Sequence, residues 1–389
     1  MIMKLYLFIV SILICGLATA QDTSNNKFGK GITIQAKDQS FKMKFSTRFQ
    51  TLYEGKLNLD SDDWSDKLLI RRARLKFEGF VYDPKFEYKI ELGLSNRDIG
   101  GTGPDFNNGS NIILDAVAKW KFHKNWALWF GQTKLPGNRE RVISSQKLQF
   151  VDRSLVNSRF NIDRDLGVQL HHKGKIGDGI LKQAIAISMG EGRNITSSNP
   201  VGYDYTGRLE YLPFGDFTNK GDYFGSDLER EEKPKLSVGI TYSFNDNAVR
   251  QRGQLGSFVT DSLGNKVTSD LKTFFVDAVL KYRGWSLTSE YGMKTGDDIA
   301  EESKFALGKG LVVQTGYLFD NDLEVAFRFT SIEPDNTDFS SLKEETEYTL
   351  GFSKYIVGHS LKVQSDFSYT EIPAGSDEFR YRFQVEVSF

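Results

Sequence analysis

The stretch FKMKFSTRFQTLY, residues 41–53, decides the fold, because its apolar and polar side chains alternate. The two alternating sets are Phe41, Met43, Phe45, Phe49 and Tyr53 on one side and Lys42, Lys44, Ser46, Arg48 and Gln50 on the other. A period of two residues is that of a β-strand with two different faces, and a helix could not use this pattern. The stretch therefore predicts a strand with one apolar and one polar face.

The same alternation recurs along the chain up to its last residue. In residues 379–389, Arg380, Arg382 and Glu386 alternate with aromatic and aliphatic side chains. Alternation also marks residues 67–81, 84–95, 112–122, 125–134, 164–173, 179–190, 203–212, 235–245, 272–283, 285–294, 310–319, 322–332, 345–356 and 358–371. Together these segments make about sixteen predicted strands. An even number is typical of an antiparallel transmembrane β-barrel from bacteria.

Composition restricts the class of protein further. Charged residues make up 26% of the chain and the mean hydropathy is −0.40, which excludes a helical membrane protein. With 30 Phe and 16 Tyr, the chain is nonetheless rich in aromatic residues. A polar average with an aromatic excess is typical of a barrel with a polar lumen and an aromatic lipid face. A secreted β-sandwich or jelly roll also alternates, but the recurrence of large aromatic side chains on one face favours the membrane barrel.

The first twenty residues are predicted to be a cleaved signal peptide. Lys4 precedes an apolar run from Leu5 to Leu17, and Ala18-Thr19-Ala20 fits the small-residue rule for cleavage. The alternative, an uncleaved anchor helix, is disfavoured because the run is too short to span a bilayer. Residues 21–39 are then expected to form a periplasmic N-terminal segment, and residues 40–389 the barrel. This organisation places the protein in the outer membrane of a Gram-negative bacterium.

The connections between predicted strands alternate in length. From a periplasmic N-terminus, the periplasmic turns are short and the external loops long, as in bacterial barrels. Residues 213–234 are the exception, a long periplasmic connection for which docking is the only role that suggests itself. The third external loop, residues 135–163, is predicted to fold into the lumen and narrow it; the alternative is an exposed surface loop. The proposed contributors to this constriction are Lys134, Arg139, Arg141, Ser144 and Ser145.

Three neighbouring strands are predicted to present cations to the lumen. The inward cations are Lys42, Lys44, Arg48, Arg72, Arg74, Lys76, Arg380 and Arg382. Because the first and last strands of a closed barrel pair, these residues share one wall, on which the only carboxylates are Glu78 and Glu386. Guanidinium and ammonium groups in a pore attract anions. Alternatively, each cation pairs with a facing acid and only stiffens the wall.

Several motifs resemble the phosphate-selective porin O and P family. They are STRFQ at 46–50, RRARLKFEG at 71–79, GQTKLP at 131–136, the Ser144-Ser145 pair, VDRSLVN at 151–157 and RDLGVQL at 164–170. The resemblance implies a trimeric barrel of sixteen strands, with an arginine ladder in the lumen and an inward-folded third loop. By this resemblance, Arg48, Arg72 and Arg74 look like ladder members. Lys134 and the two serines look like constriction residues.

The leading hypothesis is a passive outer-membrane channel that prefers phosphate, pyrophosphate or related small anions. The alternatives are a general diffusion porin without phosphate specificity and a plugged structural or adhesive barrel. Expected partners are outer-membrane lipid, lipopolysaccharide, the assembly machinery acting through Phe389, and two further copies in a homotrimer. No metal, cofactor or nucleic acid is expected, since the four histidines lack ligand spacing. No catalytic set stands out, so an enzyme is not expected.

Overall fold

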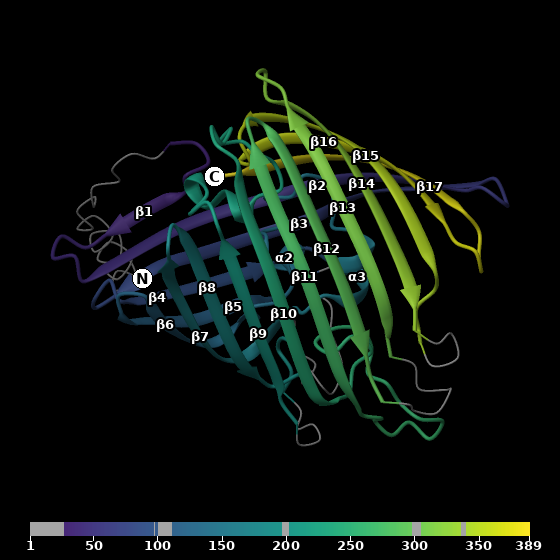
Figure 1. The fold of residues 1–389 in the computed structure, drawn as a ribbon, viewed down its shortest axis with the longest axis horizontal. Coiled ribbons are helices and arrows are strands. Elements are labelled where there is room, and N and C mark those ends of the chain that lie inside the picture. The colour runs from purple at the N-terminus through teal and green to yellow at the C-terminus, as the bar shows by residue number, and fades with distance from the viewer. Residues whose placement is uncertain (1–26, 97, 100–110, 197–201, 298–304, 336–339) are drawn as a thin grey trace, which may run out of the picture.

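The computed structural model describes residues 27–96, 98–99, 111–196, 202–297, 305–335 and 340–389. The predicted signal peptide, residues 1–20, lies outside the described residues. Figure 1 shows long, tilted strands arranged around an interior, in which short helices at Arg139–Val142 and Leu155–Phe160 lie. Among the described residues, no helix has both the length and the apolar composition needed to cross a bilayer.

Sixteen strands of the described residues form a closed antiparallel barrel. They are β2 (Phe41–Asn58), β3 (Asp63–Val81), β4 (Phe86–Gly93), β5 (Ile113–His123), β6 (Trp126–Lys134), β7 (Arg164–Ile176), β8 (Gly179–Ser188), β9 (Asp204–Leu212), β10 (Lys235–Ala248), β11 (Ser269–Tyr282), β12 (Trp285–Thr295), β13 (Gly308–Leu318), β14 (Leu323–Pro334), β15 (Glu345–Val357), β16 (Leu361–Glu371) and β17 (Glu378–Ser388). Each pairs with its neighbours in sequence, and β17 pairs with β2 to close the ring. The predicted fold class and strand order are confirmed.

A further short strand, β1 (Ile32–Gln35), lies outside this ring of sixteen. It pairs with β2 from Lys42 to Phe45. Just beyond this stretch, Thr47 exchanges two backbone hydrogen bonds with Phe389, of 2.7 and 3.0 Å. On this edge of β2, β1 therefore takes up the pairing where β17 ends. Both ends of the described chain meet at this rim. The predicted N-terminal segment contains this strand, which the alternation analysis did not assign.

Short turns lie on the same rim as the termini. The connection between β11 and β12 is the two-residue turn Arg283-Gly284, with φ of 47° and 87°. Positive φ at both positions is the backbone of the hairpin turn whose twist matches that of the strands, and glycine adopts it without strain. Other turns on this rim, at 82–85, 124–125, 177–178, 319–322 and 358–360, have two to four residues. The predicted arrangement of short periplasmic turns and longer external loops agrees with this geometry.

The outer surface of the barrel is apolar and aromatic. Phe130, Phe327 and Phe383 are 66%, 45% and 39% exposed, and alternate with polar residues that point inward. In water such a surface would be unfavourable, whereas in a bilayer it contacts hydrocarbon. The predicted assignment of the two parities to lipid and lumen agrees with this exposure pattern.

The third external loop, residues 135–163, folds into the lumen as predicted. It carries the short helices α2 (Arg139–Val142) and α3 (Leu155–Phe160), and the Ser154 hydroxyl caps α3 by accepting from Asn157 N at 3.2 Å. Apolar residues of the loop pack against apolar residues on the lumenal face of the wall: Leu135, Val156, Phe160 and Ile162 against Phe275, Val312 and Ile332. Burial of these side chains away from water holds the loop inside the barrel.

The long periplasmic connection, residues 213–234, also turns into the lumen. Phe217 packs against Ile180 and Val279. The backbone N–H of Gly225 donates to the Lys147 carbonyl of the third loop at 2.8 Å, and Ser226 Oγ donates to Glu324 at 2.6 Å. Docking was the only role suggested for this segment from sequence; in the structure it contacts the third loop and fills one side of the lumen.

The lipid exposure of β14 can be tested with one substitution at two depths. Phe327→Arg, near the middle of the strand, should lower the free energy of unfolding by about 2–4 kcal/mol in lipid vesicles. The matched change Phe319→Arg, at the periplasmic turn, should cost about 0–1 kcal/mol because the guanidinium reaches the interface. Urea unfolding in vesicles measures both. Equal costs at the two positions would contradict the assignment of this face to the bilayer.

Candidate functional site

A cavity of about 630 Å³ lies between the third loop and one side of the barrel wall. The wall residues that line it come from the strands β3 to β9, and the loop contributes residues from Leu135 to Arg153. It extends to the periplasmic turn at Lys124 and Asn125. The third loop and residues 213–234 fill the opposite side, so the cavity is off-centre in the lumen.

The lining of this cavity is strongly cationic. Among the described residues it has twelve Lys and Arg side chains: Arg74, Lys89, Lys119, Lys121, Lys124, Lys134, Arg141, Arg153, Arg164, Lys173, Lys182 and Arg208. Only two carboxylates, Glu91 and Glu210, line it with them. Carboxylates in and behind the lining pair with eight of the twelve: Arg74, Lys89, Lys121, Arg141, Arg164, Lys173, Lys182 and Arg208. The contacts of each cation therefore decide which of them can attract a solute.

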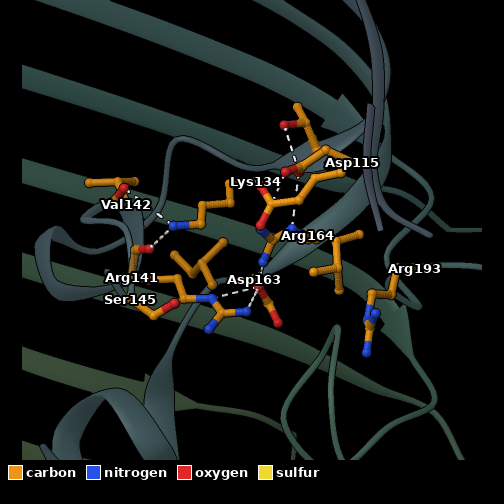
Figure 2. A network of polar contacts seen from close by, with 12 residues as sticks. Asp115, Lys134, Arg141, Val142, Ser145, Asp163, Arg164 and Arg193 are labelled. Atoms are coloured by element: carbon orange, nitrogen blue, oxygen red, sulfur yellow. Dashed lines mark hydrogen bonds and ion pairs between the residues drawn. The ribbon is translucent and has the colours of Figure 1, made fainter. Parts of the chain in front are cut away.

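Lys134 fastens the third loop to the wall. Its ammonium donates to the backbone carbonyls of Arg141, Val142 and Ile143 at 2.6, 3.3 and 3.2 Å, as Figure 2 shows for the first two. These are carbonyls at the C-terminal end of α2, where a helix leaves them without intrahelical partners and a cation is favourable. These contacts are to neutral groups, and no carboxylate of the described residues pairs with the ammonium.

Two ion pairs flank this lysine. Arg141 donates from Nε to Asp163 at 2.5 Å, and Arg164 donates to both oxygens of Asp115 at 3.0 and 3.3 Å (Figure 2). Asp163 and Arg164 are adjacent in sequence, where the loop meets β7. Paired arginines of this kind fix the geometry of the constriction, since a forked guanidinium matches a carboxylate.

The side chains of Arg153 and Lys119 have neutral partners only, among the residues that the structure describes. Arg153 donates to the carbonyls of Glu140 and Ile143, both at 2.8 Å. The Lys119 ammonium lies 3.8 Å from the ring centre of Trp129. With Lys134, these residues give the cavity three cations that no carboxylate neutralises directly.

The predicted cationic wall is largely neutralised, by acids from neighbouring strands and from the third loop. Arg48 lies 3.4 Å from Glu386 and also donates to Ser145 Oγ at 2.7 Å. Ion pairs also join Arg72 to Asp152, Arg74 to Glu91 and Asp98, Lys44 and Lys76 to Glu78, Arg380 to Glu347, and Arg382 to Asp366. Of these eight cations, only Lys42 has no such partner within the described chain. The prediction of eight cations against two acids counted only the residues of the three strands. It left out the acids that neighbouring strands and the third loop supply.

The structure separates the predicted site residues into two groups. Arg74, Lys134, Arg141, Ser144 and Ser145 line the cavity. The others are not part of its lining: Arg48, Arg72, Lys76, Lys42, Lys44, Arg139, Arg380 and Arg382. Two of them nonetheless contact lining residues, Arg48 the Ser145 hydroxyl and Arg139 the Glu210 carboxylate. Arg139, in particular, is fully buried between Asp277 and Glu210, at 2.9 and 3.4 Å, and anchors α2 to the wall.

Alternation alone missed Arg71, which also faces the lumen. A bulge in β3 shifts the register, so that Gln50 faces Arg72 while the next residue, Thr51, faces Ile70. Both arginines therefore reach Asp152, Arg71 at 2.5 Å and Arg72 at 3.2 Å. Burial raises the pKa of the Asp152 carboxyl, but these two charges hold that pKa well below its ordinary value. The apolar run Leu68-Leu69-Ile70, which breaks the alternation, was the available signal for the bulge.

Residues 43–371 match the profile of the family described as phosphate-selective porin O and P. The chain belongs to this family. The porin is 22% identical over 381 residues to an uncharacterized protein of Aquifex aeolicus strain VF5, a match that covers 89% of this chain and 87% of the other. The family and the closed barrel identify an outer-membrane channel of a Gram-negative bacterium.

Solved structures with a similar fold are also outer-membrane proteins. OmpT of Vibrio cholerae, described in its trimer form, has a TM-score of 0.54 at 11% identity and covers 90% of this chain and 100% of its own. The outer membrane channel DcaP of Acinetobacter baumannii has a TM-score of 0.54 at 12% identity, over 92% and 99% of the two chains. At these identities the likeness concerns the fold of the porin.

The fastening role of Lys134 can be tested by removing its charge. Lys134→Met should release the carbonyls at the end of α2, since hydrogen bonds from a charged group contribute about 1.5–3 kcal/mol. Amide hydrogen exchange in Arg139–Ile143 should therefore become at least about tenfold faster. Lys37→Met, on an exposed turn, is the control and should leave these amides unchanged. Unaltered exchange in the Lys134 variant would show that the loop is held by its apolar contacts alone.

Proposed function

We propose that the protein is a passive channel that prefers small anions. The observation that supports this most strongly is the lining of its cavity, with twelve cationic side chains and two carboxylates among the described residues. Rings and rows of Lys and Arg give a pore a positive potential that admits anions and repels cations. The neutral partners of Lys119, Lys134 and Arg153 leave these charges available to a passing solute.

Phosphate and related oxyanions fit this lining best. Ser144 and Ser145 border the cavity beside Arg141 and Arg153, so hydroxyl and guanidinium donors lie together at the constriction. A phosphate has several acceptor oxygens and binds such donors through charge-assisted hydrogen bonds. The name of the family supports the same class of solute. Most of the donors already have partners in the protein, which favours weak, repeated binding and hence release.

A general diffusion porin without phosphate preference is the second candidate. Arg141 and Arg164 are paired with Asp163 and Asp115, and such pairs reduce the field that an anion meets. The cavity volume of about 630 Å³ is also large for a single inorganic ion. A plugged structural barrel is less well supported, since residues 213–234 and the third loop fill only one side of the lumen.

We further propose that the chain assembles as a homotrimer, as the trimer form of OmpT suggests. Outer-membrane lipid and lipopolysaccharide would contact the aromatic outer face. The terminal residue Phe389, half exposed beside Thr47, would be the point of contact for the assembly machinery.

Ion preference can be measured from the reversal potential of single channels in a gradient of potassium chloride. The wild type should prefer chloride. Lys119→Glu replaces a cation of the lining by an anion and should shift the reversal potential toward that of potassium. Lys37→Glu, at the exposed turn, should leave it unchanged. A wild-type channel that prefers potassium would refute the proposal.

Phosphate preference can be measured as block of the chloride current by added phosphate. Arg74→Ala removes a guanidinium that lines the cavity, and should raise the half-blocking phosphate concentration at least about tenfold, the worth of one charge-assisted hydrogen bond. Arg72→Ala, two positions along the same strand but away from the cavity, should change it by less than about twofold. Heat-modifiable electrophoretic mobility verifies that each barrel is folded. No block of the wild type at any concentration would favour the general diffusion porin.

A further inference from the structure

Trp129 is an unusual residue for the polar lumen of a channel. It lies on β6, and its cross-strand neighbours are Lys119 of β5 and Gln169 of β7. All three side chains line the cavity. Lumenal positions of a water-filled barrel are ordinarily polar, and the large aromatic residues face lipid. The cationic lining of the cavity therefore includes an indole that the passage of inorganic anions does not require.

The neighbours of the indole form an aromatic and polar group with it. The His171 ring stacks on Trp129, with 4.0 Å between ring centres and 27° between planes. His171 Nε2 also lies 3.0 Å from Gln169 Oε1. These contacts hold the indole from the β7 side, so the ring presents a fixed surface to the cavity.

Among the described residues, Lys119 is the charged group that lies over this ring. Its ammonium is 3.8 Å from the indole centre, and no carboxylate pairs with it in the described part of the chain. A cation over an aromatic face at an accessible site is bound more weakly than a cation paired with an anion. An entering anion can therefore draw the flexible lysine away and uncover the ring.

The cavity has room for more than an inorganic ion. Its volume is about 630 Å³, whereas one water in the liquid occupies about 30 Å³. Volumes of roughly 300–1,000 Å³ are typical of sites for ring-bearing organic ligands. The indole lies five positions from Lys134 on β6, about 16 Å along the strand toward the periplasm. A solute that has passed the constriction reaches it next.

We propose that Trp129 and Lys119 form a subsite for organic anions that carry a planar ring, such as aryl phosphates and aromatic carboxylates. The ring of the solute stacks on the indole in place of the ammonium, and the ammonium pairs with the anionic group. This inference rests on the proposed anion preference and deepens it by naming a class of solute. A second binding site after the constriction allows each site to bind the solute weakly, and weak binding is what a channel needs for release.

The test compares two anions that share a headgroup and differ in the ring. Phenyl phosphate and methyl phosphate are each added to chloride-conducting channels, and the half-blocking concentrations are compared. In the wild type phenyl phosphate should block at a concentration roughly two- to tenfold lower, the range expected for one aromatic contact. Trp129→Leu should abolish this difference while methyl phosphate blocks as before. Lys119→Gln should weaken the block by both anions.

Trp120→Leu is the matched control, because Trp120 lies on β5 but is 45% exposed on the outer face and stacks on Phe86. It should retain the phenyl preference. Equal block by the two phosphates in the wild type, or a preference that survives Trp129→Leu, would overturn the subsite while leaving the anion channel intact. A wild type that prefers potassium, and that neither phosphate blocks, would overturn the proposed function and this inference with it.

Discussion

The seating of the third loop on an apolar patch inside the barrel determines the shape of the pore. An empty barrel of sixteen strands would leave a wide aqueous channel. Here Val156 and Phe160 of the loop are buried against Phe275 and Ile332 of the wall. Because apolar side chains on a lumenal face would otherwise contact water, the loop and its seat stabilise each other. The cavity is thereby displaced toward β3–β9, and under the proposed function the charges of that side act on the solute.

Pairing distributes the lumenal charges between two roles. On the filled side, cations such as Arg382 and Lys362 are fully enclosed and held by Asp366 and Glu386. A buried charge without a partner would be strongly unfavourable, so these pairs are a condition of filling the lumen. On the open side many cations are also paired, but Lys119, Lys134 and Arg153 contact only backbone carbonyls or an aromatic ring through their side chains. Under the proposed function, these three are the groups that a passing anion can still approach as a partner.

Most of the fold could be predicted from sequence because the strand period is local information. The alternation of side chains predicted all sixteen strands in order. The length of residues 135–163 indicated that this loop folds inward. Contacts between distant segments were not readable in this way. The partner of Arg72 lies eighty residues away at Asp152, and that of Arg139 at Asp277, so the charge balance of single strands overstated the free charge of the predicted wall.

Other features left weak signals in the sequence. The lumenal residues Phe275 and Val279 have the same parity as Asp277, and a strand that is apolar on both faces indicates a covered lumenal surface. The bulge beside Arg71 gave only the broken alternation at Leu69. For residues 213–234, the length of the connection was the signal, and only the contact of Gly225 with Lys147 shows its purpose.

That contact joins the periplasmic segment and the third loop into one partition along the barrel. On one side of the partition, side chains are packed and their substitution alters folding. On the other, side chains meet water and their substitution alters conduction. Under the proposed function, a porin divided in this way can exchange cavity-lining residues on β5–β8 to suit a different solute while the packed half preserves the architecture. Adaptation to new solutes and maintenance of the barrel are thus assigned to different strands of the same sheet.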